Sequence, residues 1–329
     1  TFLGGLAQTG WQLAATRMGV ALGEAGSLPA AHAYVSRNFD TDKRAAPLAV
    51  LTLYVPFGMT IALLLGSFLG EKLGWRGAFM TMGAVGLILT PLTFLLVRNA
   101  PIALAGPADK TARVPILPHL KKPGLIAVLA ASALIGVTGY STSFFAPSFL
   151  MRSHGLTPTE VGVQYGLTSG LIGIIGLLAA GAVADRLSAK DPRWLLGVVV
   201  ALIFALLPFS IAAFLVKGGW AAVFCISMSY LIQNAYMAPV IAAMHRLVPR
   251  QTRATASAIL LFVSATVGGF GPYITGKISD AYQAELGAQS LSHALLIVLP
   301  VGHLAAGLIY LFAALRLRKD IVPEAPTTP

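Results

Sequence analysis

Long apolar stretches, separated by short polar segments, dominate the pattern of this chain. About 20 consecutive apolar residues are enough for a helix to cross the hydrocarbon core of a bilayer. Nine stretches meet this length, at about residues 12–36, 46–70, 77–97, 124–151, 161–184, 194–216, 218–245, 254–276 and 292–315. The pattern therefore predicts an all-α, polytopic membrane protein with nine full transmembrane helices. Residues 1–10 read as the end of one more helix.

Two charged residues interrupt the apolar pattern. Arg17 and Glu24 are the only formal charges inside a predicted span. Because a charge at membrane depth costs about 2.5 kcal/mol or more, it usually has a function or a partner. Seven residues of helix place the two on one face, about 10 Å apart along the axis. That spacing is too long for a direct pair within the helix, so a structural ion pair would need another partner for each.

Both charges are candidates for a transport site. The planar donors of Arg17 suit phosphate and carboxylate groups, which predicts an anionic headgroup as its ligand. An apolar environment favours the neutral form of a carboxyl group, so Glu24 is the candidate proton carrier. Further polar residues in the spans are weaker candidates for substrate binding, since any one of them could equally be a packing contact. They are Tyr54, Tyr140, Gln233, Asn234 and Tyr236.

The composition excludes several other classes of protein. Hydrophobic residues make up 56% of the chain and charged residues 11%, against about a quarter charged in soluble domains. The net charge of +11 comes from cations scattered over short loops, without the basic patch typical of a nucleic-acid-binding protein. The single cysteine, Cys225, and the six histidines show no metal-ligand spacing. We therefore expect no cofactor, no metal site and no nucleic-acid partner.

The cations also predict the orientation in the membrane. If the loops alternate sides, seventeen Lys and Arg residues fall on one side and five on the other, and Arg17 completes the total of 23. Because basic residues concentrate in cytoplasmic loops, the richer side is predicted to be the cytoplasm. This places a multi-pass protein in the cell (inner) membrane with its C-terminus in the cytoplasm.

A weak internal repeat suggests two bundles. Arg37 and Arg246, and likewise Arg44 and Arg253, are 209 residues apart, and each pair follows a span of the same predicted direction. If the first span corresponds to the seventh, the repeat is six helices long, and the fourth to ninth spans form one complete copy. The other copy would then lack its first helices, so we expect an N-terminally truncated chain.

The predicted domains follow from this repeat. A basic, proline-rich cytoplasmic loop would join the bundles, and a short cytoplasmic tail would follow the second. The four parts are residues 1–97, the remainder of the N-terminal six-helix bundle; 98–123, the central loop; 124–316, the C-terminal six-helix bundle; and 317–329, the tail.

The loop between the fifth and sixth spans carries a recognisable motif. Its sequence GAVADRLSAKDPR contains Gly181, Asp185, Arg186 and Arg193. It resembles the G-x-x-x-D-R-x-x-x-R/K loop of the major facilitator superfamily, and it lies between the second and third helices of a six-helix repeat, as in that family. The resemblance implies two six-helix bundles and a conformational-switch loop, in which Asp185 caps or pairs across a helix interface. The alternative is a solvated basic loop.

The first half resembles one branch more specifically. The string RMGVALGEA from Arg17 to Ala25 and the later segments GWRGAF and RATASA are similar to the Spinster branch, the sphingosine-1-phosphate and lysophospholipid transporters and their bacterial relatives. The resemblance implies that Arg17 and Glu24 line a central cavity and that Glu24 takes part in proton coupling. Branches for organic anions and hexuronates share parts of the pattern.

Secondary active transport by alternating access is therefore the leading hypothesis. The expected partners are a small amphipathic or organic-anion substrate, with a lysolipid favoured, protons and the lipid bilayer, and we expect a monomer. A drug or hexuronate substrate is the alternative. A membrane enzyme would need clustered acidic or histidine residues at one membrane face, and a channel would need a charged ring or filter. The sequence shows neither pattern.

Overall fold

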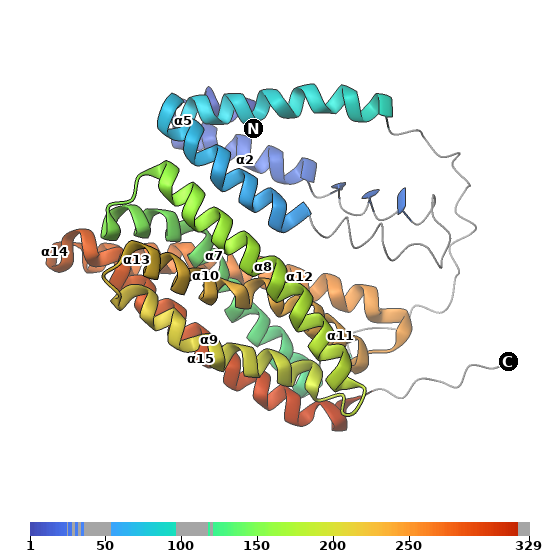
Figure 1. Ribbon diagram of the computed structural model, residues 1–329. Helices are drawn as coiled ribbons and strands as arrows, with labels where there is room; N and C mark the ends of the chain where they lie inside the picture. The colour runs from blue at the N-terminus through green and yellow to red at the C-terminus, as the bar shows by residue number, and fades with distance from the viewer. Residues whose placement is uncertain are drawn as a thin grey trace. The chain divides into compact units, whose positions relative to one another are not determined.

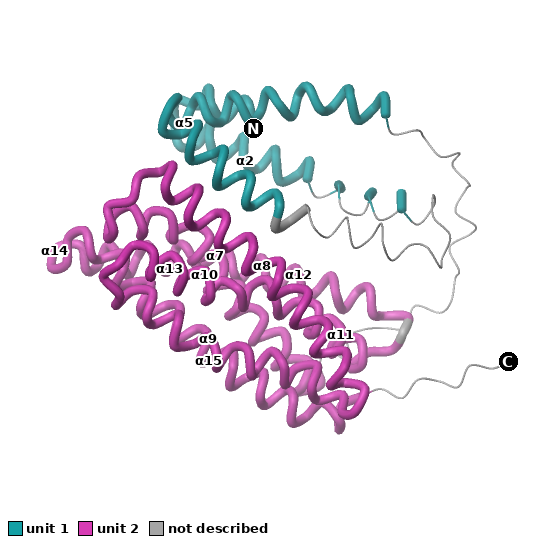
Figure 2. The backbone as a smooth tube through the Cα atoms, in the orientation of Figure 1, with its two compact units in different colours: residues 1–111 teal, residues 112–329 magenta. Residues whose placement is uncertain are grey.

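A computed structural model describes residues 1–24, 26–27, 30–31, 34–35, 54–96, 118 and 121–321. The regular elements of these residues are all helices. The chain divides into two compact units, residues 1–111 and 112–329, coloured separately in Figure 2. The division falls within residues 98–123. Each unit is described by itself below.

Unit 1 contains α1 (Phe2–Gly5), α2 (Gly10–Glu24) and α5 (Tyr54–Leu96). Helix α5 turns sharply at Gly74, where φ is 69° and ψ is 170°. Figure 1 shows the two legs of α5 meeting at this turn. A residue with a side chain would be strained at this positive φ, which is why glycine suits the position. The turn separates the spans predicted at 46–70 and 77–97.

Close backbone contacts fix α1 against the second leg of α5. A Cβ atom on Gly83 would lie 2.3 Å from the backbone nitrogen of Phe2, and one on Gly5 would lie 2.6 Å from the backbone oxygen of Arg76. The Arg76 side chain also donates a hydrogen bond of 3.1 Å from Nη2 to the carbonyl oxygen of Ala7. Small residues therefore allow the close approach of these helices, as in many membrane helix pairs.

Unit 2 forms the larger helical bundle, labelled in Figure 1. Its helices correspond to the six spans predicted between 124 and 315. Their bounds are α7 (Pro123–His154), α8 (Pro158–Ser188), α9 (Trp194–Leu215), α10 (Gly219–Ala235), α11 (Met237–Leu247), α12 (Arg253–Gly268), α13 (Phe270–Ala281), α14 (Gln283–Leu286) and α15 (Ser290–Asp320), with short 3-10 helices at Arg250–Thr252 and Gly287–Gln289.

Helix α7 is the central element of unit 2. It packs against α15, α12, α13 and α10, and its contacts depend on small residues. A Cβ atom on Gly136 would lie 2.4 Å from the Ser264 carbonyl oxygen, and one on Gly271 would lie 2.2 Å from the Val137 carbonyl oxygen. Leu125, at the start of α7, is fully buried, and close van der Waals packing of such side chains stabilises helices against one another in a membrane.

The helices confirm the predicted fold class. Within the described part of the chain, seven helical segments are long and apolar enough to cross a membrane, and one of them, 57–96, contains both legs of α5. The first predicted span is represented by α2, which ends at Glu24. Several residues between 25 and 36, together with Arg37 and Arg44 of the predicted repeat, lie outside the described residues.

Candidate transport site

Helix α2 presents both intramembrane charges on an exposed surface of unit 1. None of its residues is buried, and the side chains of Arg17 and Glu24 are exposed. The Arg17 guanidinium lies over the ring of Phe79, with 5.6 Å from Cζ to the ring centroid. Such a contact is attractive through the ring quadrupole. It orients Arg17 without an acidic partner.

Glu24, at the end of α2, makes a different contact among the described residues. Its backbone carbonyl accepts a hydrogen bond of 2.8 Å from Ser27 Oγ, while its carboxylate forms no ion pair with any residue that the structure describes. The two charged side chains of α2 therefore do not neutralise each other. Their roles as headgroup ligand and proton carrier stay predictions.

Helices α7, α8 and α10 bring together a polar cluster inside unit 2. Gln233 packs directly over Gly139 of α7, where an added Cβ would lie 2.2 Å from Gln233 Oε1. Asn234 packs on Gly173 of α8 in the same manner, at 3.2 Å from Nδ2. Ser143 donates a hydrogen bond of 3.2 Å to the hydroxyl of Tyr230. The glycines thus make room for two amides in the last turn of α10, next to its junction with α11.

Several polar atoms near this cluster lack hydrogen-bond partners. They include Oε1 of Gln164, the hydroxyl of Tyr165 and Oε1 of Gln233, all buried and without a partner among the described residues. Tyr165 lies close enough to Tyr230 to interact with it electrostatically. Buried polar atoms normally find a partner in protein or water. These atoms are therefore available to a bound water or to polar groups of a ligand.

Sequence reasoning missed Tyr165 and Tyr230. An isolated tyrosine in a membrane span is common and carries little signal by itself. The signal that could have found them is the register of glycines on the facing helices, such as Gly173 and Gly176 of α8 opposite Asn234 and Leu231.

The remaining predicted binding residues have different environments. Tyr140 is 37% exposed and its ring lies close to Gly268. Tyr236 is fully buried, and its hydroxyl is 3.1 Å from Ser264 Oγ. In this structure Tyr236 is therefore a packing residue of the core. The side chain of Tyr54 lies outside the described residues.

The Tyr236 contact belongs to a buried chain of hydroxyl groups. Ser264 Oγ donates to the Ser132 carbonyl oxygen at 3.2 Å, and Ser132 Oγ lies 2.7 Å from the Tyr310 hydroxyl. This chain connects the α10–α11 junction, α12, α7 and α15. Such polar contacts inside a membrane bundle join helices that apolar contacts alone would hold less specifically.

The predicted switch loop is placed at the junction of α8 and α9. Gly181, Asp185 and Arg186 lie in the last part of α8, and Arg193 directly precedes α9. Asp185 and Arg186 are exposed. A Cβ on Gly181 would contact nothing within 4 Å, so this glycine does not enable a close helix approach inside unit 2. The pairing of Asp185 across an interface stays a prediction.

A neighbouring acid, Asp191, forms the ion pair of this loop. Its Oδ2 is 3.0 Å from Nη2 of Arg318, at the end of α15. The backbone N–H of Arg193 donates to Asp191 Oδ1 at 3.0 Å. The hydrogen bond from Arg193 and the nearby Arg318 charge lower the pKa of Asp191 below its usual value. Asp191 therefore ties the α8–α9 loop to the C-terminal end of α15.

Comparison with known proteins gives the family. The family model of the Major Facilitator Superfamily matches residues 1–272. The chain is 49% identical over 327 residues to an MFS-type efflux pump of Mycolicibacterium smegmatis, across 99% of this chain and 76% of that protein. It is 26% identical to Protein spinster homolog 3 of Mus musculus, across 95% of this chain and 66% of that protein.

A solved structure shares the fold. The bacterial homologue of the human lysosomal transporter Spinster, in an inward-facing and occupied conformation, superposes with a TM-score of 0.83 at 23% identity. The match covers 98% of this chain and 80% of that one. The chain spans 56% of the length of Protein spinster homolog 1 of Bos taurus. This chain therefore belongs to the Major Facilitator Superfamily, as a Spinster-like, multi-pass membrane transporter of small molecules.

Proposed function

We propose that the protein is a proton-coupled secondary transporter that exports an amphipathic organic anion by alternating access. The observation that carries the proposal is the surface of α2, an apolar helix that presents one cation and one carboxylate, neither of which forms an ion pair with a described residue. A charge kept at this depth has a functional role more readily than a structural one when no partner neutralises it.

Arg17 is the proposed ligand for the anionic group of the substrate. Its contact with the face of Phe79 leaves the edges of the guanidinium free to donate hydrogen bonds. Those edges match the oxygen spacing of a carboxylate or phosphate. A substrate anion bound here would also lie beside the Phe79 ring, which favours a ligand with an apolar part next to its charge.

Glu24 is the proposed proton carrier. It lies two helical turns from Arg17 on the same helix, so proton binding and substrate binding can influence each other through charge. Protonation would remove the one formal negative charge of α2 and so lower the cost of moving this helix surface between environments. We propose this coupling of proton to substrate because the Glu24 carboxylate forms no ion pair with a described residue.

Unit 2 carries neutral polar atoms of its own that could bind a ligand. Among the described residues, Oε1 of Gln233 has no partner and can accept a hydrogen bond, and the hydroxyl of Tyr165 has none and can accept or donate one. The described spans of unit 2 carry no formal charge near these atoms. Because Arg17 is the single cation of α2, we favour an amphipathic monoanion, such as a lysolipid, over a multiply charged metabolite.

The direction of transport and the alternative substrate rest on relatives. The name of the M. smegmatis protein, MFS-type efflux pump, supports export. Probable sugar efflux transporters of Helicobacter pylori are 27% identical over 202 residues, and the amides of Gln233 and Asn234 would suit a sugar acid such as a hexuronate. We further propose a monomer with a cytoplasmic C-terminus.

The deciding experiment is pH-gradient-driven transport in proteoliposomes. A lysophospholipid, a sphingoid phosphate and a hexuronate would be compared at equal concentration, with and without a protonophore. The proposal expects accumulation of an amphiphile that collapses with the protonophore. Transport of the hexuronate alone would replace the substrate class, and transport that ignores the pH gradient would remove proton coupling.

A further inference from the structure

A cationic pocket lies at the end of unit 2 where α15 begins. Its volume is about 520 Å³. The last turn of α7, the end of α9, and the region from α14 to the first turns of α15 form its walls. Because α15 is 31 residues long, this end lies about 45 Å from the α15 terminus that carries Arg318. The polar cluster around Gln233 contributes no residue to this pocket.

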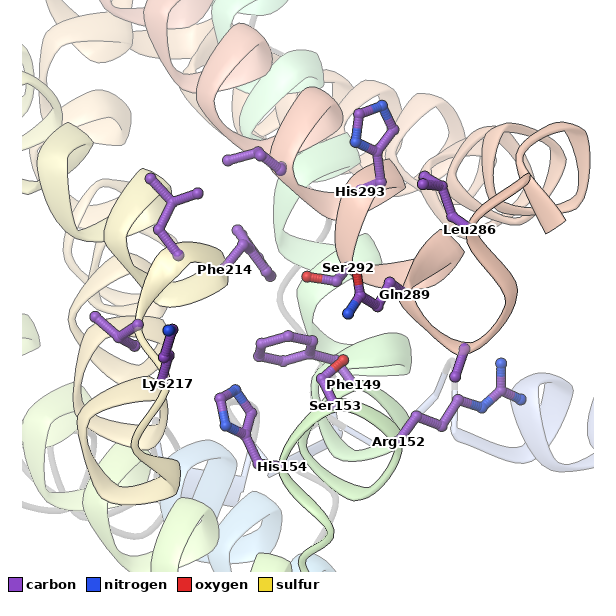
Figure 3. A pocket seen from close by; sticks show the side chains of 14 residues that line it. Phe149, Arg152, Ser153, His154, Phe214, Lys217, Leu286, Gln289, Ser292 and His293 are labelled. Atoms are coloured by element: carbon purple, nitrogen blue, oxygen red, sulfur yellow. The ribbon is translucent and has the colours of Figure 1, made fainter.

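The polar lining is basic. Arg152, Lys217, His154 and His293 line the pocket, and none of its described lining residues is acidic. Neither Arg152 nor Lys217 forms an ion pair with a residue of the described chain. Figure 3 shows Lys217 on one side of the view and Arg152 on the other, with the Phe149 ring between them and Gln289 and Ser292 above that ring. Two unpaired cations and two neutral donors make a favourable environment for an anion.

The rest of the lining is apolar and aromatic. Phe149 and Phe214 stack edge to face with ring centroids 5.0 Å apart, and His154 contacts Phe149 at 5.3 Å. Leu215 also lines the pocket and is 64% exposed, so the pocket continues onto the outer apolar surface of the bundle. Nearby Trp220, at the start of α10, is 65% exposed. Exposed tryptophans at the ends of membrane helices mark the interface with lipid headgroups.

We infer that this pocket binds the phosphate headgroup of an anionic bilayer lipid. The cations lie at the ends of membrane-spanning helices, where lipid phosphates are found. Arg152 and Lys217 hold the phosphate, Gln289 and Ser292 donate to its free oxygens, and an acyl chain leaves along Leu215. A free phosphate would use the same cations but would leave Phe149, Phe214 and Leu215 without a ligand contact.

Native mass spectrometry of the full chain tests this inference. The purified protein would be titrated with short-chain phosphatidylglycerol, short-chain phosphatidylcholine and inorganic phosphate. We expect one tightly bound phosphatidylglycerol, weaker phosphatidylcholine and no competition by millimolar phosphate. Equal binding of the two lipids, or full displacement by inorganic phosphate, would overturn the inference.

Two sets of variants place the lipid in this pocket. Arg152→Gln combined with Lys217→Gln should weaken phosphatidylglycerol binding at least about tenfold, since each cation contributes a charge-assisted hydrogen bond. Ser292→Asp, which leaves both cations in place but adds a carboxylate to the lining of the pocket, should weaken it similarly. Lys277→Gln is the matched control, because Lys277 contacts Tyr273 and does not line the pocket. A melting temperature within a few degrees of wild type would show that each variant folds, and unchanged lipid binding in both pocket variants would contradict the inference.

Discussion

Helices α2 and α7 both carry polar residues within an apolar sequence, but they use them differently. In α7, the buried hydroxyls bond to their own helix, as Thr142 Oγ1 does to the Thr138 carbonyl at 2.8 Å, or to a neighbour, as Ser141 Oγ does when it accepts from Thr275. In α2 no residue is buried and the two charges have no acidic or basic partner among the described residues. The buried hydroxyls of α7 thus hold the bundle together, whereas the two charged side chains of α2 are exposed on unit 1, and we propose that they bind ligands.

This difference is tested most strongly at Glu24. Glu24→Gln should abolish proton-driven accumulation, because an amide mimics the protonated carboxyl group and cannot release a proton. Substrate exchange without a pH gradient should remain measurable. The melting temperature should stay unchanged, because the Glu24 side chain is exposed. Uptake and exchange in proteoliposomes are the measurements.

The matched control is Glu285→Gln, in the exposed helix α14. It removes the same charge from unit 2 and should leave coupling intact. If Glu24→Gln accumulated substrate as well as the wild type does, Glu24 would be a structural residue, and α2 would not differ from α7 in this respect.

The second test concerns Arg17. Arg17→Ala should weaken binding of an anionic amphiphile by about tenfold to a hundredfold, the effect of losing a charge-assisted hydrogen bond. Binding of an uncharged analogue should change little. Arg17→Lys should restore binding only in part, because an ammonium cannot donate through a planar fork.

Equilibrium binding of the charged and uncharged amphiphiles to the three proteins is the measurement. An equal loss for both ligands would show that Arg17 acts through packing on Phe79 rather than through its charge.

The spans of unit 2 could be predicted well because each is an uninterrupted apolar run. Two details inside these runs could not. The predicted span 218–245 divides at Tyr236 into α10 and α11, and the chain from 254 to 276 divides at Gly269 into α12 and α13. Both divisions depend on how neighbouring helices pack, which hydropathy along the chain does not record. The turn at Gly74 was easier, since its polar and glycine residues stand between two apolar runs.

The candidate site was predictable where a residue type is rare in its setting. Arg17 and Glu24 stood out because charges are costly in apolar spans. Tyr165 did not stand out. Its hydroxyl is a candidate because it is buried without a partner among the described residues, and that depends on how the facing helix packs. In the switch loop, Asp185 matched a family motif, yet Asp191 forms the ion pair. The ion pair of Asp191 could not be predicted, because it depends on Arg318, 127 residues away, while the pairing of Asp185 stays a prediction.

The third test concerns α7 and the buried hydrogen bonds that join it to its neighbours in unit 2. Tyr310→Phe removes the hydroxyl that lies 2.7 Å from Ser132 Oγ in the buried chain of unit 2. It should lower the free energy of unfolding by about 1 kcal/mol, a usual value for such a bond in a membrane bundle. Substrate affinity should stay unchanged. Unfolding of the purified protein in detergent, monitored by circular dichroism, is the measurement.

Tyr273→Phe provides the control for this change, since Tyr273 is 64% exposed and its removed hydroxyl is not buried. Equal stability of the two variants would mean that the buried hydroxyl chain contributes nothing measurable to unit 2.

The smallest effect is expected at the surface pair of Asp191 and Arg318. The Arg193 backbone N–H and the Arg318 guanidinium lower the pKa of Asp191 in the folded protein, so the ionised carboxylate stabilises the fold. This contribution is complete above the pKa of the unfolded chain, near 3.8, and is lost as the pH falls through the lower folded value. Wild type should therefore melt slightly above Asp191→Asn at neutral pH, and the difference should vanish in strong acid or in molar salt.

Asp185→Asn is the control for this change. Asp185 is an exposed acid in the same loop and has no ion pair within the described residues of unit 2, so its variant should show no such pH-dependent difference. If Asp185→Asn and not Asp191→Asn showed the pH-dependent melting difference, the prediction would be wrong. The acid that holds this end of the bundle would then be the one in the family motif and not the one in the observed ion pair.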